Sequence, residues 1–281
     1  MSFQVLNDLE LAELLVKSAA QQVLEFTSDA WHTQDKREGI STDIVTEADR
    51  AAQRVMIELL RTHRPEDGIK AEEDGMLTEG ARQWLLDPID GTLAYIMGIP
   101  LWAVAACLRN YGETIVTAIY HPDSKQLFTA HKGQAPLCNG EKIHVAAPVT
   151  LHDAVVHTHC GIGVSDVPEF IPAYQRLMPK VGCLYAGGSC SLKLSWIASG
   201  RSHAYIELYP PGVDKDWDWE PGSFLVRQAG GSTREVGIWR IAANTEALAD
   251  ELQELVAPRA QRAVPKSEVL ALDEWLEENP E

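Results

Sequence analysis

The sequence is short of basic residues. Its 281 residues include 24 Lys and Arg against 41 Asp and Glu, which gives a formal net charge of −17. Such a surface repels the phosphates of nucleic acids and of anionic membranes, so we exclude polymeric nucleic acid and membrane as partners. If the substrate is itself anionic, bound cations are needed to attract it.

Paired cysteines and long apolar runs are also missing. The chain has five scattered cysteines, none in C-x-x-C spacing: Cys107, Cys138, Cys160, Cys183 and Cys190. This odd set indicates reduced thiols rather than a disulfide framework or a zinc site. The first residues lack the basic start of a signal peptide, and no apolar stretch approaches the length of a membrane span. We therefore expect a cytoplasmic protein.

Helix and strand patterns alternate along the chain. Apolar residues at helical spacing predict helices within residues 7–28, 46–63, 167–178, 190–200, 222–232 and 245–256. Strands are predicted at 83–87, 153–161 and 201–208, and a run of strands with turns at 110–112, 121–123, 132–133 and 139–140 is predicted over 101–146. Residues 29–43 and 64–81 are expected to be mainly loop. This mixture indicates layered α and β structure.

The stretch "WLLDPIDGT" ends an apolar strand with two carboxylates. Asp87 is expected to close the strand, and Pro88 to bend the chain so that Asp87 and Asp90 lie on one side and the Ile89 carbonyl is free. Three hard oxygen donors at one corner suit Mg²⁺. A helix that starts at Gly91 would offer its N–H groups to phosphate. The alternative is that Asp90 only caps this helix.

Two further acidic segments lie elsewhere in the chain. Glu72 and Glu73 are adjacent in "AEEDG", and they repel each other unless water or a cation neutralises them. Asp218 stands between two tryptophans in "WDWEPG" at a predicted helix start, where an acid is either an N-cap or a ligand. A solvated pair and a helix cap are the alternatives to a metal site.

Taken together, these motifs resemble those of the inositol monophosphatase family of Mg²⁺-dependent, lithium-sensitive phosphatases. "WLLDPIDGT" resembles the family's D-P-I/L-D-G-T signature, and "WDWEPGSFLVRQAGG" resembles its W-D-x-A-A-G signature. "AEEDG", "DIVTEAD" and "CNGEKIHV" resemble three further family segments, and all five occur in the family's order over about residues 10–257. The resemblance implies a layered αβαβα sandwich of the inositol monophosphatase and sugar phosphatase type, with sub-halves at 1–148 and 149–257 and a tail at 258–281.

The resemblance also implies roles for single residues. Glu72, Asp87 and the Ile89 carbonyl would hold a first Mg²⁺, and Asp87, Asp90 and Asp218 a second. A third, weaker ion would depend on Glu72. Thr92, paired with Asp49, would orient and deprotonate the nucleophilic water, so the catalytic residues would be Thr92, Asp49 and Glu72. Gly91 and Thr92 would bind phosphate. The candidate substrate contacts are Asp90, Ser189, Glu207 and Glu220.

The implied function is a Mg²⁺-dependent phosphomonoesterase that acts on a small phosphorylated polyol, sugar or amino alcohol. Alternatives are a 3′(2′),5′-bisphosphate nucleotidase and a ligand-binding or regulatory family member with little turnover. A homodimer is expected, because two-fold dimers are the commonest oligomers. The chain departs from the family's pattern at Ala94, where Asn is usual, and at Glu220-Pro221, which replaces an Ala-Ala pair. Glu220 either binds a cationic part of the substrate or points to solvent.

The histidines of "HTHC" are a further feature of the sequence. His157 and His159 share one face of a predicted strand, because alternate residues point the same way. They either bind metal or substrate or are two half-buried strand residues.

Overall fold

A computed structural model of the chain describes residues 6–26, 33–35, 44–159, 167–209 and 215–258. Most of the predicted 29–43 loop, Cys160 of "HTHC" and the predicted tail from 259 onwards lie outside these residues. None of the helices within them is both long and apolar enough to cross a membrane.

The helices are α1 (Asp8–Leu24), α2 (Glu47–His63), α3 (Thr92–Ile96), α4 (Phe170–Leu177), α5 (Cys190–Ala198), α6 (Asp216–Gln228) and α7 (Glu246–Val256), with a 3₁₀ turn η2 (Leu151–Asp153). Four of the described helices, α1, α2, α5 and α7, begin at a residue whose side chain caps the helix. Asn7 and Glu10 form a capping box on α1, and Thr46 and Asp49 form one on α2. Thr46, the first residue of the predicted 46–63 helix, is thus the N-cap of α2.

The strands form two large sheets and one small one. An eight-stranded sheet contains β3 (Gly68–Ala71), β4 (Gly75–Thr78), β5 (Arg82–Asp90), β6 (Ala103–Asn110), β7 (Glu113–His121), β8 (Gln126–His131), β9 (Leu137–Cys138) and β10 (Glu141–Lys142). A five-stranded sheet contains β11 (Val155–Thr158), β12 (Cys183–Ala186), β13 (Ala204–Leu208), β14 (Ser232–Val236) and β15 (Trp239–Ala243). β1 (Thr33–Asp35) and β2 (Ile44–Thr46) pair only with each other.

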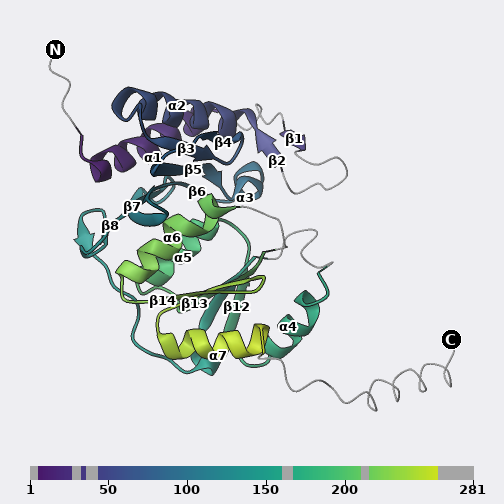
Figure 1. Ribbon diagram of the computed structural model, residues 1–281. Coiled ribbons are helices and arrows are strands. Elements are labelled where there is room, and N and C mark those ends of the chain that lie inside the picture. Colours follow the sequence, from purple (N-terminus) through teal and green to yellow (C-terminus); the bar gives the residue numbers. More distant parts are fainter. Residues whose placement is uncertain (1–5, 27–32, 36–43, 160–166, 210–214, 259–281) are drawn as a thin grey trace.

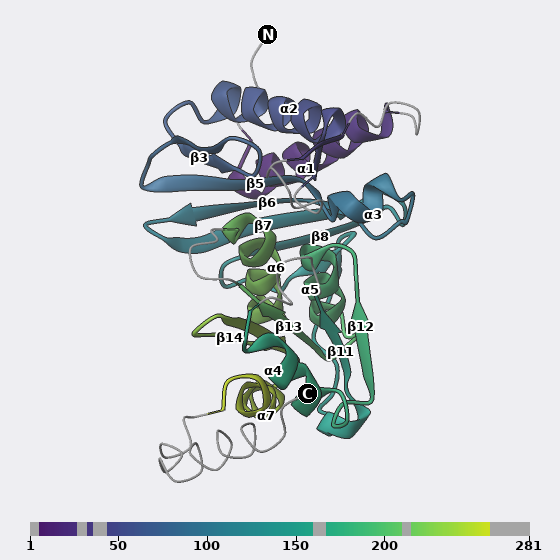
Figure 2. The same ribbon diagram turned by 90° about the vertical axis from the view of Figure 1, so that its right-hand side faces the viewer.

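The elements stack in five layers, as Figures 1 and 2 show. From the top of Figure 1, these are α1 and α2, the eight-stranded sheet, α5 and α6, the five-stranded sheet, and α4 and α7. Each interface between layers is an apolar core. The predicted αβαβα fold is confirmed. The division at 148/149 stays a prediction, although it lies between the last strand of one sheet and the first of the other.

The hairpin turns follow the sequence closely. Tyr111-Gly112 joins β6 to β7 and Asn139-Gly140 joins β9 to β10, and all four residues have positive φ, as a tight hairpin turn requires. Two expectations were wrong, one on residues 64–81 and one on the start of α6. Residues 64–81 contain β3 and β4, whose four-residue length hides their periodicity. No strands were predicted for residues 232–243, which contain the β14–β15 hairpin. Helix α6 begins at Asp216, six residues before the predicted start, and Pro221 therefore lies inside the helix.

β5 does not end at Asp87, contrary to the prediction. It continues to Asp90 through a bulge, because Asp87 pairs with Ala105 of β6 and Asp90 pairs with Ala103. The extra residue changes the alternation of side chains. Ile89 keeps to the core beneath α1 and α2, while Asp87 and Asp90 both point to the opposite face, toward α5 and α6. The bulge, rather than a terminal turn, places the two carboxylates together.

Candidate active site

The carboxylate of Asp87 is buried, and no N–H or hydroxyl group of the described chain donates a hydrogen bond to it. Only 1% of the residue is exposed. Burial, followed by the negative charges of Glu72, Asp90 and Asp218 and by close contact with the Glu72 carboxyl group, raises the pKa of Asp87 well above its ordinary value. A buried acid in this state calls for either a proton or a cation.

Glu72 reaches Asp87 because β3 and β5 run parallel. Ala71 pairs with Leu86, and the N–H of Glu72 donates to the Leu86 carbonyl at 3.1 Å. Glu72 therefore lies beside Asp87 at the same end of the sheet. The backbone of the next residue, Glu73, is bound to α2, because its N–H donates to the side-chain oxygen of Gln53 at 3.0 Å. The predicted acidic pair thus separates, and Glu72 is the member whose charge acts on Asp87.

Asp90 joins the eight-stranded sheet to α5. Its two oxygens accept from the Ser189 hydroxyl at 2.6 Å, the Cys190 N–H at 3.0 Å and the Ser191 N–H at 2.6 Å. Asp90 therefore binds the positive end of a helix, and this helix is α5 rather than the one that follows Gly91. Burial raises the pKa of Asp90, and the bonds from Ser189, Ser191 and Cys190 oppose that rise. A carboxylate has about four acceptor sites, so three bonds leave room for a cation.

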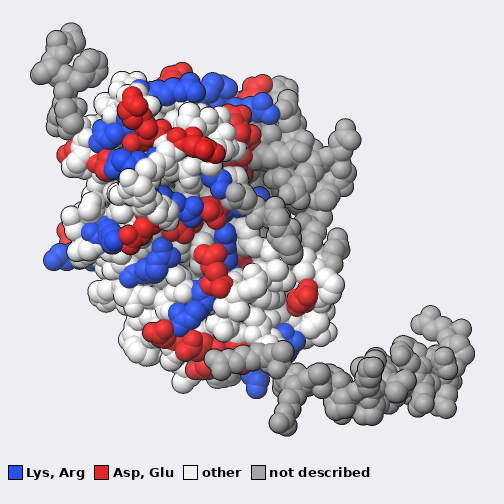
Figure 3. Space-filling view, in the orientation of Figure 1, with Lys and Arg blue, Asp and Glu red and all other residues white. Residues whose placement is uncertain are grey.

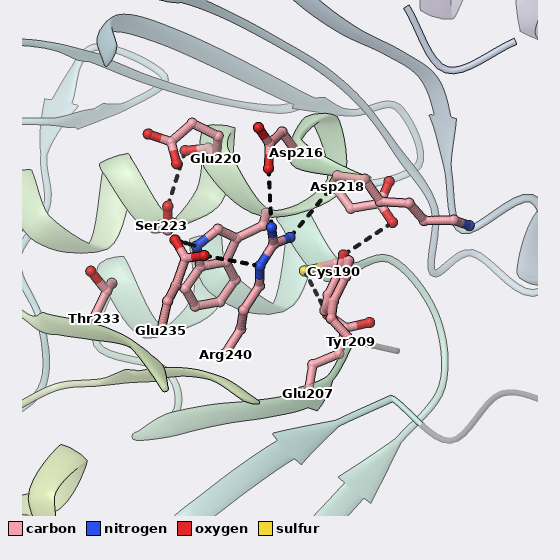
Figure 4. Close-up of polar contacts among 12 residues, drawn as sticks. Cys190, Glu207, Tyr209, Asp216, Asp218, Glu220, Ser223, Thr233, Glu235 and Arg240 are labelled. Carbon is pink, nitrogen blue, oxygen red and sulfur yellow. Dashed lines mark hydrogen bonds and ion pairs between the residues drawn. The ribbon is translucent and has the colours of Figure 1, made fainter. Parts of the chain in front are cut away.

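Asp218 lies in the first turn of α6 and faces the same acidic group. Burial raises its pKa well above the ordinary value; Lys215 opposes this, and the charges of Glu72, Asp90 and Glu207 add to it. The Tyr209 hydroxyl lies 3.5 Å from one Asp218 oxygen. Arg240 stacks on the Tyr209 ring at 3.9 Å and pairs with Asp216 at 3.0 Å, as Figure 4 shows. This chain of contacts holds the start of α6 against β15.

Thr92, Asp49 and the Ile89 carbonyl meet where β5 passes into α3. The Thr92 hydroxyl lies 3.1 Å from the Ile89 carbonyl oxygen and 3.4 Å from Asp49 Oδ1. The other oxygen of Asp49 accepts from the Thr46 N–H at 2.8 Å. The capping box of α2 therefore fixes the carboxylate that faces Thr92.

Gly91 allows two segments to pass close to this corner. Its φ is +94°, and a Cβ added there would lie 2.9 Å from the Leu101 carbonyl oxygen and 3.0 Å from the Ser189 nitrogen. The Ser189 N–H donates to that same carbonyl at 2.9 Å. Only glycine fits here, so Gly91 is needed for the approach of α5 as well as for its own backbone conformation.

Ser189 and Glu207 line the α5 side of the site. The Ser189 hydroxyl donates to Asp90 and accepts from the Leu192 N–H at 2.9 Å, so Ser189 is the N-cap of α5. Glu207 is 7% exposed and accepts from the Tyr205 hydroxyl at 2.6 Å. The Cys190 thiol lies 3.8 Å from the same Glu207 oxygen, and burial raises the pKa of that thiol well above its ordinary value.

Glu220 faces a different set of partners. Its carboxylate accepts from the Thr114 hydroxyl at 2.6 Å and pairs with Arg227 at 3.2 Å and with Arg109 at 3.6 Å. These contacts join α6 to β6 and β7. Ion pairs of this kind are in keeping with the molecular face shown in Figure 3, where acidic and basic side chains lie next to one another. The proposed contact of Glu220 with substrate stays a prediction, and its partners favour a role in holding α6.

The donor set fits hard divalent cations, although within the described ranges no three acidic, His or Cys side chains already meet as a metal site. Asp90 is turned to α5 and Asp218 to Tyr209. The fit rests on Asp87, whose buried oxygens receive no hydrogen bond from an N–H or hydroxyl group of the described chain and lie among the charges of three other carboxylates. Carboxylate and carbonyl oxygens are the ligands that Mg²⁺ prefers.

The sequence interpretation missed Tyr205, Tyr209 and Arg240. All three come from strands of the five-stranded sheet or the chain beside them, and each contacts an acidic residue of the site or its support. A signal for Arg240 was available, since it is a charged residue within the apolar strand "WRIAA". The tyrosines had no such signal, because an aromatic residue in a strand is ordinary.

Comparison with known proteins gives one consistent answer. Residues 7–264 match the inositol monophosphatase family. The chain is 32% identical over 235 residues to inositol-1-monophosphatase of Rhizobium meliloti (strain 1021), covering 79% of this chain and 85% of that protein. It is 33% identical over 194 residues to Nus factor SuhB of Escherichia coli (strain K12), covering 68% and 71%.

The fold agrees with this match. The structure of inositol monophosphatase from Anabaena (Nostoc) sp. PCC 7120 superposes with a TM-score of 0.76 at 25% identity, covering 89% of this chain and 96% of that one. The match covers nearly the whole chain, and the layered fold agrees with it. The chain belongs to the inositol monophosphatase family and is a phosphatase.

Proposed function

We propose that the protein is a Mg²⁺-dependent phosphomonoesterase for a small phosphorylated polyol, sugar or amino alcohol. The observation that carries this proposal is the buried carboxylate of Asp87 at the β5 bulge, to which no described N–H or hydroxyl group donates and which is surrounded by the charges of Glu72, Asp90 and Asp218. This arrangement is costly for a protein without cations, since each negative charge raises the cost of the next. It becomes favourable when cations bind.

Glu72, Asp87 and the Ile89 carbonyl would hold one Mg²⁺, and Asp87, Asp90 and Asp218 a second; a third would depend on Glu72. When bound, Mg²⁺ neutralises the phosphate oxygens and lowers the pKa of nearby water. The net charge of −17 is then no obstacle to an anionic substrate, because the acidic residues gather cations and the cations attract phosphate.

The protein's own part in the reaction is to orient water and to receive its proton. Thr92 Oγ1 accepts the proton of the attacking water and passes its own proton to Asp49 Oδ1, 3.4 Å away. Asp49 Oδ2 stays bonded to the Thr46 N–H, which keeps the carboxylate in place. The N–H groups of Gly91 and Thr92 bind the phosphate. The water oxygen bonds to phosphorus as the phosphorus–alcohol bond breaks, and the departing oxygen takes a proton from solvent.

The test is a phosphate-release assay with Mg²⁺ and with chelator. It covers inositol phosphates, histidinol phosphate, fructose bisphosphate and adenosine bisphosphate, the last being a nucleotidase substrate. The parent should release phosphate only with Mg²⁺, and Asp87→Asn should not. Asp123→Asn is the matched control, because Asp123 is exposed in the turn between β7 and β8. Metal-independent hydrolysis by the parent would contradict the proposal.

A second candidate function is regulatory. Relatives that cover 68% of this chain are named Nus factor SuhB rather than by an enzymatic activity. On this reading the acidic cluster would bind cations with little turnover. Mg²⁺ binding by the parent without phosphate release from any of the esters would favour it.

We also infer a homodimer. Leu93 and Met97, at α3 and its end, are 49% and 61% exposed, and Ile99 follows at 37%. These apolar side chains lie near one another on a short segment, as expected of a surface that a second copy covers. Met97→Glu should shift the mass measured by light scattering from dimer to monomer. A parent that is monomeric at micromolar concentration would contradict the inference.

A further inference from the structure

The histidines of "HTHC" have no part in the reaction described above, yet one of them lies at the site. β11 ends at Thr158, and the five-stranded sheet places it between β12 and β13, beneath α5 (Figure 2). His157 faces α5, since its ring lies 5.5 Å from that of Trp196. His159, two residues on, points to the same side of the sheet.

The two imidazoles have different surroundings. His157 is 4% exposed and is enclosed between the rings of Tyr185 and Trp196. His159 keeps its access to solvent. His157 is therefore a core residue, and His159 is the one that a ligand can reach.

Strand register places His159 beside Glu207. β11 and β13 are parallel, with His157 opposite Tyr205 and Thr158 opposite Ile206. The next residue on each strand is His159 and Glu207, respectively. Glu207 is on the α5 face as well, because its carboxylate contacts the Cys190 thiol. The two side chains are thus neighbours on one face, at the end of α5 that binds Asp90.

The backbone of His159 is anchored from both sides of the sheet. Lys193 of α5 donates to the Thr158 carbonyl at 3.0 Å, and on the other face the Thr158 hydroxyl bonds to the Tyr174 hydroxyl. Crowding by surrounding atoms lowers the pKa of His159; Glu207 opposes this, and Lys193 and Lys215 add to it.

We propose that His159 is a specificity-determining residue that binds, together with Glu207, adjacent hydroxyl groups of the leaving alcohol. The site would then favour phosphate esters whose leaving alcohol carries adjacent hydroxyl groups over esters whose leaving group has none. This inference rests on the proposed phosphatase function and names the part of the substrate that the α5 side of the site recognises.

The chemistry of the pair suits hydroxyl groups. Glu207 can only accept, whereas a neutral imidazole donates from one nitrogen and accepts at the other. A hydroxyl that donates to Glu207 can still accept from His159, and a neighbouring hydroxyl can donate to the free imidazole nitrogen.

The test compares inositol 1-phosphate with 4-nitrophenyl phosphate, whose leaving group has no such hydroxyls. The ratio of the two kcat/KM values should fall about tenfold in His159→Phe, mainly through KM, as expected for one lost hydrogen bond. His159→Gln, which keeps a donor and an acceptor, should recover part of the ratio. His144→Phe is the control, because His144 is exposed and bonds only to the neighbouring Val145 carbonyl at 2.9 Å.

A general folding defect would lower both rates and leave their ratio unchanged. A ratio for His159→Phe within twofold of the parent would overturn the assignment of His159. If the parent hydrolyses neither ester, the proposed function fails, and calorimetric binding of inositol 1-phosphate with Ca²⁺ then decides the inference separately. Binding about tenfold weaker in His159→Phe supports it, and equal binding overturns it.

Discussion

Replacing Asp87 with Asn should make the metal-free protein more stable and the Mg²⁺-loaded protein less stable than the parent. The variant keeps the shape of the side chain and removes a buried charge that no donor satisfies. Its amide also offers two donors to the carboxylates whose charges act on position 87, Glu72, Asp90 and Asp218. Without metal the interaction therefore changes from repulsive to attractive.

The size of the effect follows from the burial. A buried polar group left without a partner costs about 1–3 kcal/mol, and more if it is charged. The metal-free variant should gain about this much, or about 2–4 °C in Tm per kcal/mol. Mg²⁺ at 100 times its Kd stabilises the parent by about 2.7 kcal/mol. The variant should lose most of that response, so the order of stability reverses when Mg²⁺ is added.

The assay is thermal unfolding by circular dichroism in chelator and in a Mg²⁺ series, with Asp123→Asn as the exposed control. The control should follow the parent in both conditions. A metal-free Asp87→Asn protein that melts below the parent, or one that keeps the parent's full response to Mg²⁺, would refute the reasoning.

Three further predictions concern groups around the site. His157 has its pKa lowered from 6.5 to about 4, mainly by burial. Between these pH values the unfolded chain binds a proton that the folded chain does not. The free energy of unfolding therefore falls by about 3 kcal/mol as the pH drops from about 6.5 to about 4. Urea unfolding of His157→Phe should show a weaker dependence of stability on pH, and a dependence equal to that of the parent would count against this explanation. Gly91→Ala should lower the free energy of unfolding, measured in urea, by about 1–3 kcal/mol more than Gly112→Ala does. Both glycines have positive φ, but only at Gly91 would the added Cβ also collide with the Leu101 carbonyl. Equal losses of stability in the two variants would contradict the packing argument. Glu220→Gln should lower the free energy of unfolding by about 1–2 kcal/mol, because it weakens the contacts with Thr114 and Arg227. The ratios of kcat/KM values among the phosphate esters should stay the same. A changed ratio would place Glu220 in the substrate pocket.

Local chemistry explains which parts of the fold the sequence predicts well. The α2 cap at Thr46 and the turn at Asn139-Gly140 depend on side chains a few residues apart, and the sequence displays them directly. The short strands β3 and β4 were missed because four residues carry too little pattern. They are strands because neighbouring strands pair with them.

The site, too, has one part that local sequence predicts and another that depends on distant contacts. The motifs identify Glu72, Asp87, Asp90 and Asp218 as candidates, but the mechanism that brings the middle two together is a bulge set by pairing with β6. The bonds from α5 to Asp90 join residues about a hundred positions apart in the sequence. Contacts between residues so far apart in the sequence depend on how the layers stack, so a local sequence pattern cannot predict them.

The central claim is that the carboxylates around Asp87 hold divalent cations. The most direct measurement is crystallography of the protein with Mn²⁺ in place of Mg²⁺, using the anomalous signal of manganese. We predict a manganese peak bonded to Asp87 and Glu72, and a second peak bonded to Asp87, Asp90 and Asp218. An Asp87 carboxylate with no manganese bonded to it, at a Mn²⁺ concentration that supports phosphate release, would contradict the account.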